Sequence, residues 1–190
     1  MTVLLTVNQL VDSRINLTNN TPITFTVKAG EVLYIVGANG SGKSTLLNLI
    51  AGILPTQNGV INAQPFFYCG HKTGLKPSLS IQDNINFRCA IYGKTTTEQT
   101  EVLSLFQLEK LKNRLLGSLS QGQQRQVALV SGVLSKRQLW ILDEPFSNLD
   151  KQAQYIFKEQ LNRHLQKGGA AVIAAHDFLK EEMSSYFELK

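Results

Sequence analysis

Residues 37–45 read GANGSGKST, and this segment restricts the possible folds more than any other part of the chain. It fits the pattern G-x-x-x-x-G-K-[ST], and it stands between the apolar run EVLYIV at 31–36 and the helix-like STLLNLIA at 44–51. Glycines in such a strand–loop–helix segment let backbone N–H groups and a helix N-terminus approach a phosphate. We therefore predict that nucleotide phosphates are bound by Gly37, Asn39, Gly40, Gly42, Lys43, Ser44 and Thr45.

The other apolar runs predict an α/β fold, and the motif at 37–45 makes it one of the P-loop NTPase type. Strand-like runs stand at 2–11, 23–28, 138–142 and 170–175, residues 60–69 are expected to be extended, and a helix is expected over 151–165. Alternation of strands and helices predicts a mostly parallel sheet flanked by helices. The first strands predict a reduced N-terminal antiparallel β lobe, and residues 80–135 a small helical lobe, inside a single domain over 1–190.

Bulk properties exclude several classes of protein. Of the 190 residues 43% are apolar and 17% charged, which is ordinary for a globular domain. No run approaches the roughly 18 apolar residues that a membrane helix needs, and the first residues do not resemble a secretory signal. Cys69 and Cys89 form no metal-binding or redox pattern, so free thiols are expected. The net charge is +5, but the sequence contains no long run of Lys or Arg residues. We therefore expect no nucleic-acid partner.

An acidic strand end, WILDEP at 140–145, supplies carboxylates for catalysis. A buried strand ending there delivers Asp143 and Glu144 to the carboxyl edge of the sheet, where α/β folds bind ligands. Asp143 and the Ser44 hydroxyl are the predicted Mg²⁺ ligands, and Glu144 is the predicted residue that orients or deprotonates the attacking water. His176 follows another strand and is expected near the γ-phosphate.

LSQGQ at 119–123 and SNLD at 147–150 complete a set of motifs. With GANGSGKST, WILDEP and His176 in this order, the chain resembles the nucleotide-binding domain of ABC ATPases over nearly its whole length. The resemblance implies a head-to-tail dimer of two copies around ATP. In that dimer Ser120, Gly122 and Gln123 of one copy contact the nucleotide held by Lys43 of the other, and Asp150 lies in the loop that communicates between the sites.

The spacing and the sequence of the motifs exclude some other classes of nucleotide-binding protein. The interval between Lys43 and Ser120 is too short for the coiled coil of chromosome-maintenance relatives, and the absence of NKxD argues against a GTPase. The segment GHKTGLK at 70–76 places His71 where most transporter ATPases have glutamine, and with WILDEPF it resembles the haem-exporter type of cytochrome c maturation ATPase. We expect His71 to sense nucleotide or Mg²⁺ rather than to ligate haem.

The resemblance implies an ATP hydrolase with ATP and Mg²⁺ as cofactors, at the cytoplasmic face of a bacterial inner membrane or its organellar equivalent. It is expected to contact the membrane only through an integral membrane subunit, and to energise haem export or release of a haem-loaded chaperone. The alternatives are the ATPase subunit of another small-substrate transporter and a nucleotide-gated switch with little turnover. Candidates for the docking surface, with core packing as the alternative, are Leu75, Ile81, Ile85, Phe87, Ile91 and Tyr92.

The family often stacks an aromatic residue on adenine, and residues 12–18 (DSRINLT) contain none. Arg14 is an alternative, since a guanidinium face can stack on a ring.

Overall fold

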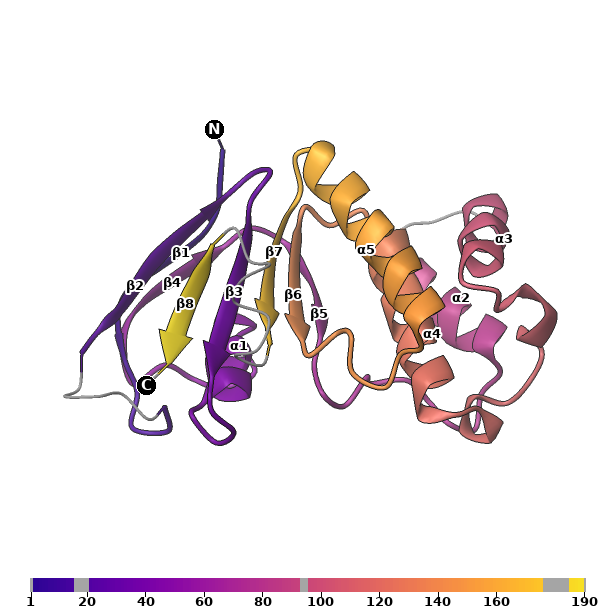
Figure 1. Cartoon of the computed structure of the whole chain (residues 1–190), viewed down its shortest axis with the longest axis horizontal. Helices are drawn as coiled ribbons and strands as arrows, with labels where there is room; N and C mark the ends of the chain where they lie inside the picture. The colour runs from indigo at the N-terminus through magenta and orange to yellow at the C-terminus, as the bar shows by residue number, and fades with distance from the viewer. Residues whose placement is uncertain (1, 16–20, 93–95, 176–184, 190) are drawn as a thin grey trace. The chain divides into compact units, whose positions relative to one another are not determined.

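The computed structural model describes residues 2–15, 21–92, 96–175 and 185–189 and divides into two compact units (Figure 1). The first unit comprises 1–71, 137–144 and 164–190, and the second comprises 72–136 and 145–163. The helical lobe expected at 80–135 lies inside the second unit. The assignment of 1–190 to one nucleotide-binding domain stays a prediction.

A small antiparallel sheet in the first unit forms the predicted N-terminal β lobe. Its central strand β1 (Val3–Val11) pairs with β2 (Ile23–Lys28) on one side and with β4 (Asn58–Ala63) on the other. Thr6 lies opposite both Thr26 and Asn62. The buried side chains of β1 include Leu5 and Val7, which belong to the core of the first unit.

A five-stranded parallel sheet, in the order β5-β6-β7-β3-β8, carries the phosphate loop (Figure 1). Its strands are β3 (Val32–Gly37), β5 (Phe66–Cys69), β6 (Leu139–Asp143), β7 (Ala170–Ala174) and β8 (Tyr186–Leu189). Every residue of β6 and β7 is buried, as expected of strands covered on both faces. The mostly parallel sheet is therefore confirmed.

Two details of the sheets differ from the sequence prediction. The extended segment expected at 60–69 is two strands, β4 and β5, which belong to different sheets. β8 was not predicted, because its four residues YFEL include a glutamate and give no strand pattern of their own. Helix α1 (Lys43–Ile50) packs on the parallel sheet, and its buried Leu46 and Leu47 join the core.

The second unit is mainly helical. It contains α2 (Ile81–Tyr92), α3 (Thr96–Leu105), α4 (Gln121–Leu134), the first part of α5 (Lys151–Gln166) and two short 3-10 turns, η2 (Glu109–Leu111) and η3 (Leu116–Ser118). α2 and α3 both pack on α4. In α5 Phe157 and Leu161 are buried as the periodicity predicts, whereas Ile156 and Leu165 are only half-buried.

The sequence predicts helix caps at Ser80 and Thr97 and a turn at 19–22, and the structure confirms the first cap. The Ser80 hydroxyl accepts a hydrogen bond from the Asp83 N–H at 3.0 Å, which caps α2 as predicted. α3 begins at Thr96, so the predicted cap Thr97 is already helical. The predicted turn at 19–22 falls largely outside the described residues.

The exposure of the side chains at 71–92 shows which docking candidates lie at the surface and which belong to the core. Ile81 and Ile85 are fully buried, so these two docking candidates belong to the helical core instead. Phe87 and Ile91 are 64% and 60% exposed. Leu75 is half-buried, and the Tyr92 side chain lies outside the described residues.

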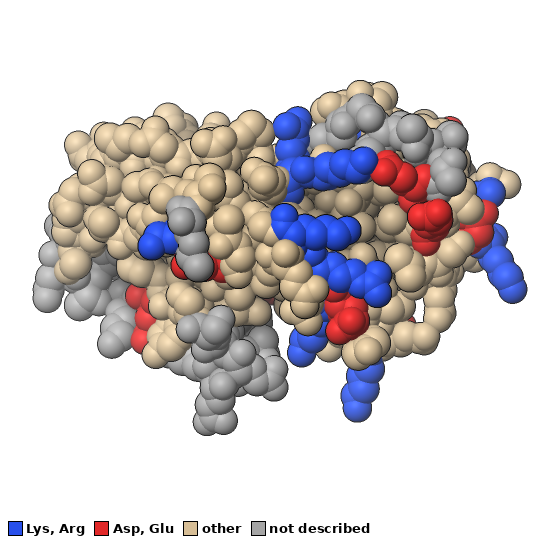
Figure 2. Space-filling model, turned by 90° about the horizontal axis from the view of Figure 1, so that it is seen from above, with Lys and Arg blue, Asp and Glu red and all other residues tan. Residues whose placement is uncertain are grey.

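The described surface carries a group of basic side chains. On the face drawn in Figure 2, Lys and Arg side chains gather together with a few acidic ones, although the sequence holds no long basic run. None of the helices within the described residues combines the length and apolarity needed to cross a membrane.

Candidate nucleotide site

The phosphate loop joins β3 to α1, and two of its glycines, Gly37 and Gly42, could not be replaced by another residue without displacing a neighbour. Gly42, the N-cap of α1, has φ +100°, and a Cβ there would lie 2.9 Å from the Ile15 Cα. A Cβ on Gly37 would lie 2.6 Å from the Ser41 Oγ. The loop can therefore bring its backbone N–H groups close to an anion, as the sequence predicts.

Side chains of the loop divide into buried and exposed groups. Lys43 is buried, and its Nζ donates to the carbonyl oxygens of Gly37 at 2.6 Å and Ala38 at 3.0 Å. Asn39, Gly40 and Ser44 are exposed, and Thr45 is half-buried. The Ser41 hydroxyl is buried without a hydrogen-bond partner among the described residues. A buried hydroxyl that lacks a hydrogen-bond partner is consistent with a loop that binds phosphate oxygens.

The acidic strand end lies at the same edge of the sheet. Ala174 in β7 pairs with Asp143 on one side and with Ile35 of β3 on the other, so the ends of all three strands are aligned. Asp143 is buried as the last residue of β6. Glu144 has φ +47°, and its N–H donates to the Ala174 carbonyl at 3.1 Å. This left-handed backbone ends the strand directly after Asp143.

Of the two histidines predicted to act here, only His71 lies within the described residues. His71 is exposed and follows β5, whose Cys69 pairs with Leu142 of β6. His71 therefore lies just after the end of β5, which pairs with β6, the strand that ends at Asp143. His176 follows β7 and lies outside the described residues.

Among the described residues, the candidate metal ligands at this edge are Ser44 and Asp143. No group of three or more His, Cys, Asp or Glu side chains suited to a metal occurs within the described residues. Ser44 and Asp143 offer oxygen ligands, and Mg²⁺ is usually held by one or two protein oxygens with phosphates and water. Ser44 and Asp143 are therefore suitable oxygen ligands for the Mg²⁺ of MgATP.

The LSQGQ segment forms a capping box at the start of α4, inside the second unit. The Ser120 Oγ accepts from the Gln123 N–H at 3.2 Å, and the Gln123 Oε1 accepts from the Ser120 N–H at 3.1 Å. Ser120 is exposed, and its hydroxyl proton is not used by the box. Gln123, predicted to contact nucleotide, is seen here as the partner of Ser120.

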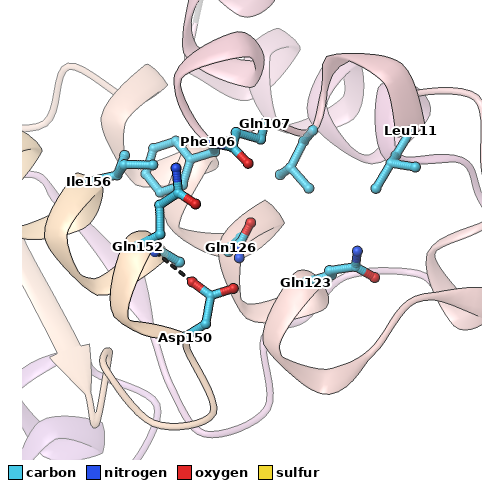
Figure 3. A pocket seen from close by; sticks show the side chains of 10 residues that line it. Phe106, Gln107, Leu111, Gln123, Gln126, Asp150, Gln152 and Ile156 are labelled. Atoms are coloured by element: carbon cyan, nitrogen blue, oxygen red, sulfur yellow. Dashed lines mark hydrogen bonds between the residues drawn. The ribbon is translucent and has the colours of Figure 1, made fainter.

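Asp150 caps α5, because its Oδ1 accepts from the Ala153 N–H at 2.8 Å. Beside it lies a pocket of about 130 Å³ between α4, the start of α5 and the segment after α3 (Figure 3). Its polar side chains include Gln123, Gln126, Asp150 and Gln152, and its apolar ones include Phe106, Leu111 and Ile156.

The structure groups the predicted residues into two sets. The phosphate loop, Asp143, Glu144 and His71 belong to the first unit, and Ser120, Gly122, Gln123 and Asp150 to the second. Sequence reasoning missed Ile15 and Ser41, which shape the phosphate loop. Ile15 belongs to no motif. Ser41 stands in an x position of the loop pattern, where the pattern does not specify the residue type.

The sequence pattern of the ABC transporter family matches residues 20–147. The cytochrome c biogenesis ATP-binding export protein CcmA of Paracoccus denitrificans is 39% identical over 175 residues, which are 91% of this chain and 82% of that protein. Its namesake in Xanthomonas campestris is 35% identical over 167 residues, 82% of this chain and 78% of that protein.

Solved structures agree with this similarity. The ATP-binding subunit of an ABC transporter superposes with a TM-score of 0.87 at 25% identity, covering 98% of this chain and 85% of the other. A nucleotide-free ATP-binding cassette of an ABC transporter has a TM-score of 0.78 at 18% identity over 98% and 87% of the two chains, which shows the shared fold.

Proposed function

From the premise that this chain belongs to the ABC transporter family, among the cytochrome c biogenesis ATP-binding export proteins, we propose that it hydrolyses MgATP to energise a transporter in cytochrome c maturation. The alignment of the phosphate loop and Asp143 on either side of β7 carries this proposal. It brings anion-binding N–H groups and a metal-binding carboxylate to one edge of one sheet.

Each residue of this edge has a chemical role in the proposal. Lys43 and the N–H groups of the loop bind the β- and γ-phosphates, and Ser44 and Asp143 hold Mg²⁺, which neutralises developing charge on the phosphates. Glu144 orients and deprotonates the attacking water, while His176 hydrogen-bonds near the γ-phosphate. His71, next to this edge, senses the bound nucleotide.

The composite site of the proposal needs a second copy of the chain. The capping box engages the Ser120 and Gln123 N–H groups and leaves the Ser120 hydroxyl proton available to a phosphate of the other copy. ATP then joins two copies head to tail, and hydrolysis releases them because the γ-phosphate contacts the second copy only in the closed state.

Glu144→Gln tests this mechanism. The variant should bind ATP, lose nearly all phosphate release and form an ATP-dependent dimer on size-exclusion chromatography. Glu101→Gln, at an exposed position on α3, is the matched control and should behave as the wild type. Full phosphate release by Glu144→Gln would remove Glu144 from catalysis.

The proposed membrane subunit docks on the exposed face of α2. Phe87 and Ile91 are one helical turn apart and therefore lie on the same face. Hydrogen bonds tie the GHKTGLK segment to this helix: Arg88 donates to the Thr73 carbonyl at 2.5 Å, and Asn84 bonds both N–H and C=O of Lys76 at 2.8 and 3.0 Å. The residues that follow His71 in the sequence are therefore held to α2.

Phe87→Asp combined with Ile91→Asp tests the docking surface. The double variant should keep the ATP affinity of the isolated subunit and fail to co-purify with the proposed membrane subunit. Leu105→Asp, at a 43% exposed position on α3, should still co-purify. Retained co-purification of the α2 variant would place the docking surface elsewhere.

The proposed location follows from this partner: the cytoplasmic face of a bacterial inner membrane, with membrane contact through the membrane subunit. The work performed is haem export or release of a haem-loaded chaperone. Deletion of the gene should abolish holo-cytochrome c while leaving the apo-proteins synthesised, measured by haem staining. Normal holo-cytochrome c in the deletion strain would contradict the assignment to this pathway.

A further inference from the structure

The turn that follows β1 is held by a charged pair with four polar contacts. The Asp12 carboxylate accepts from the Arg14 Nε at 2.7 Å, Nη2 at 2.6 Å and backbone N–H at 3.0 Å. The same Nη2 also donates to the Pro55 carbonyl at 2.6 Å. The Ile15 N–H donates to the Asp12 carbonyl at 3.0 Å, which closes the turn.

This turn lies against the beginning of α1. Ile15 is buried, and its Cα and side chain fill the place where a Cβ of Gly42 would stand. Pro55 follows the end of the same helix, which finishes at Ile50. The Asp12–Arg14 pair therefore connects the N-cap of α1, through Ile15, with the segment after its C-terminus.

The surroundings of the Asp12–Arg14 pair favour the charged form of both side chains. The Asp12 side chain is fully buried and that of Arg14 is 35% exposed. Hydrogen bonding from Arg14 keeps the pKa of Asp12 below its ordinary value. A buried carboxylate is tolerated only when paired, so losing Arg14 would force the turn to rearrange.

We propose that Asp12 and Arg14 are positioning residues for ATP binding, which hold Ile15 against Gly42 so that the phosphate loop presents its N–H groups at fixed places. They touch no reacting atom and act through the loop. Asp143 and Glu144 come from another strand, so the pair affects nucleotide affinity far more than the chemical step. This inference rests on the proposed ATP binding by the loop.

The test compares Arg14→Ala, Asp12→Asn and the double variant in the full chain. Each single variant should raise the KM for ATP and its Kd by roughly tenfold while kcat changes less than about twofold. Because the two residues act as a unit, the double variant should be no worse than either single one. Lys112→Ala, which breaks the half-buried 2.7 Å pair with Glu109 in the second unit, is the control and should leave the KM unchanged.

Ile15→Ala tests the connection itself. It leaves the charged pair intact and should also raise the KM, because the phosphate loop loses its support. All assays are made where unfolding curves show each variant folded. A fall in kcat at constant KM and Kd would overturn the inference, as would unchanged Kd in Arg14→Ala. Failure of the wild type to bind ATP would instead overturn the proposed function.

Discussion

The backbone of Gly122 packs directly against the Asn148 carbonyl oxygen, and a Cβ on Gly122 would overlap that oxygen. Asn148 itself has a left-handed backbone, with φ +60°. LSQGQ and SNLD, far apart in sequence, therefore meet within the second unit. Within one copy of the chain, LSQGQ is therefore in direct contact with the loop that leads to Asp150.

Gly122→Ala should consequently harm both stability and function. The methyl group must displace either α4 or the Asn148 loop, and such overpacking costs about 1–3 kcal/mol of the free energy of unfolding. We expect urea unfolding at a lower midpoint and reduced ATP-dependent dimerisation in the Glu144→Gln background. Gln121→Ala, an exposed change in the same turn, is the control. An unchanged unfolding midpoint would show that this packing is loose.

Ser120 can be tested separately as a cap and as a proposed phosphate ligand. Ser120→Ala removes both roles and should cost about 1 kcal/mol of helix-capping stability. Ser120→Asp keeps an acceptor for the Gln123 N–H but has no hydrogen-bond donor for a phosphate, so it should retain stability and lose ATP-dependent dimerisation. Dimerisation of Ser120→Asp at wild-type ATP concentrations would limit Ser120 to the cap.

Tyr68→Phe should weaken the attachment of β5 to α1. The Tyr68 hydroxyl donates to the Asn48 Oδ1 at 2.6 Å, and both side chains are half-buried. Removing one partner of such a bond costs about 1 kcal/mol, measured as the free energy of unfolding. Tyr155→Phe, at a 66% exposed position, should cost much less. Equal losses in both variants would contradict a specific role for the Asn48 contact.

His164 should make stability depend on pH. Its ring stacks on Trp140, with centroids 4.0 Å apart, and burial lowers its pKa below the usual 6.5. The folded state therefore favours the neutral ring, so stability is full above about pH 6.5 and declines as the pH falls toward the lowered pKa. Urea midpoints should be lower at pH 5.5 than at pH 7.5. His164→Gln should reduce that difference; an undiminished difference would assign it to other groups.

Motif spacing was enough to predict the phosphate loop and the acidic strand end, because both depend on local backbone chemistry. GANGSGKST predicts a strand–loop–helix, and WILDEP predicts a buried strand ending in carboxylates. β8 could not be predicted in this way, since its pairing with β3 provides the stability that its own four residues lack. Ile81 and Ile85 likewise could not be told from Phe87 and Ile91 by composition, because burial depends on α4 packing over one face of α2.

The sequence by itself determined the α/β class, the nucleotide chemistry and the family, since these follow from residue types at short, regular spacing. Only the tertiary structure decided that Ala174 aligns Asp143 with the phosphate-loop strand, that Ile15 supports Gly42, and that Gly122 meets Asn148. These relationships join segments distant in the chain. They depend on the register of strands and on the space between packed backbones, which no local pattern encodes.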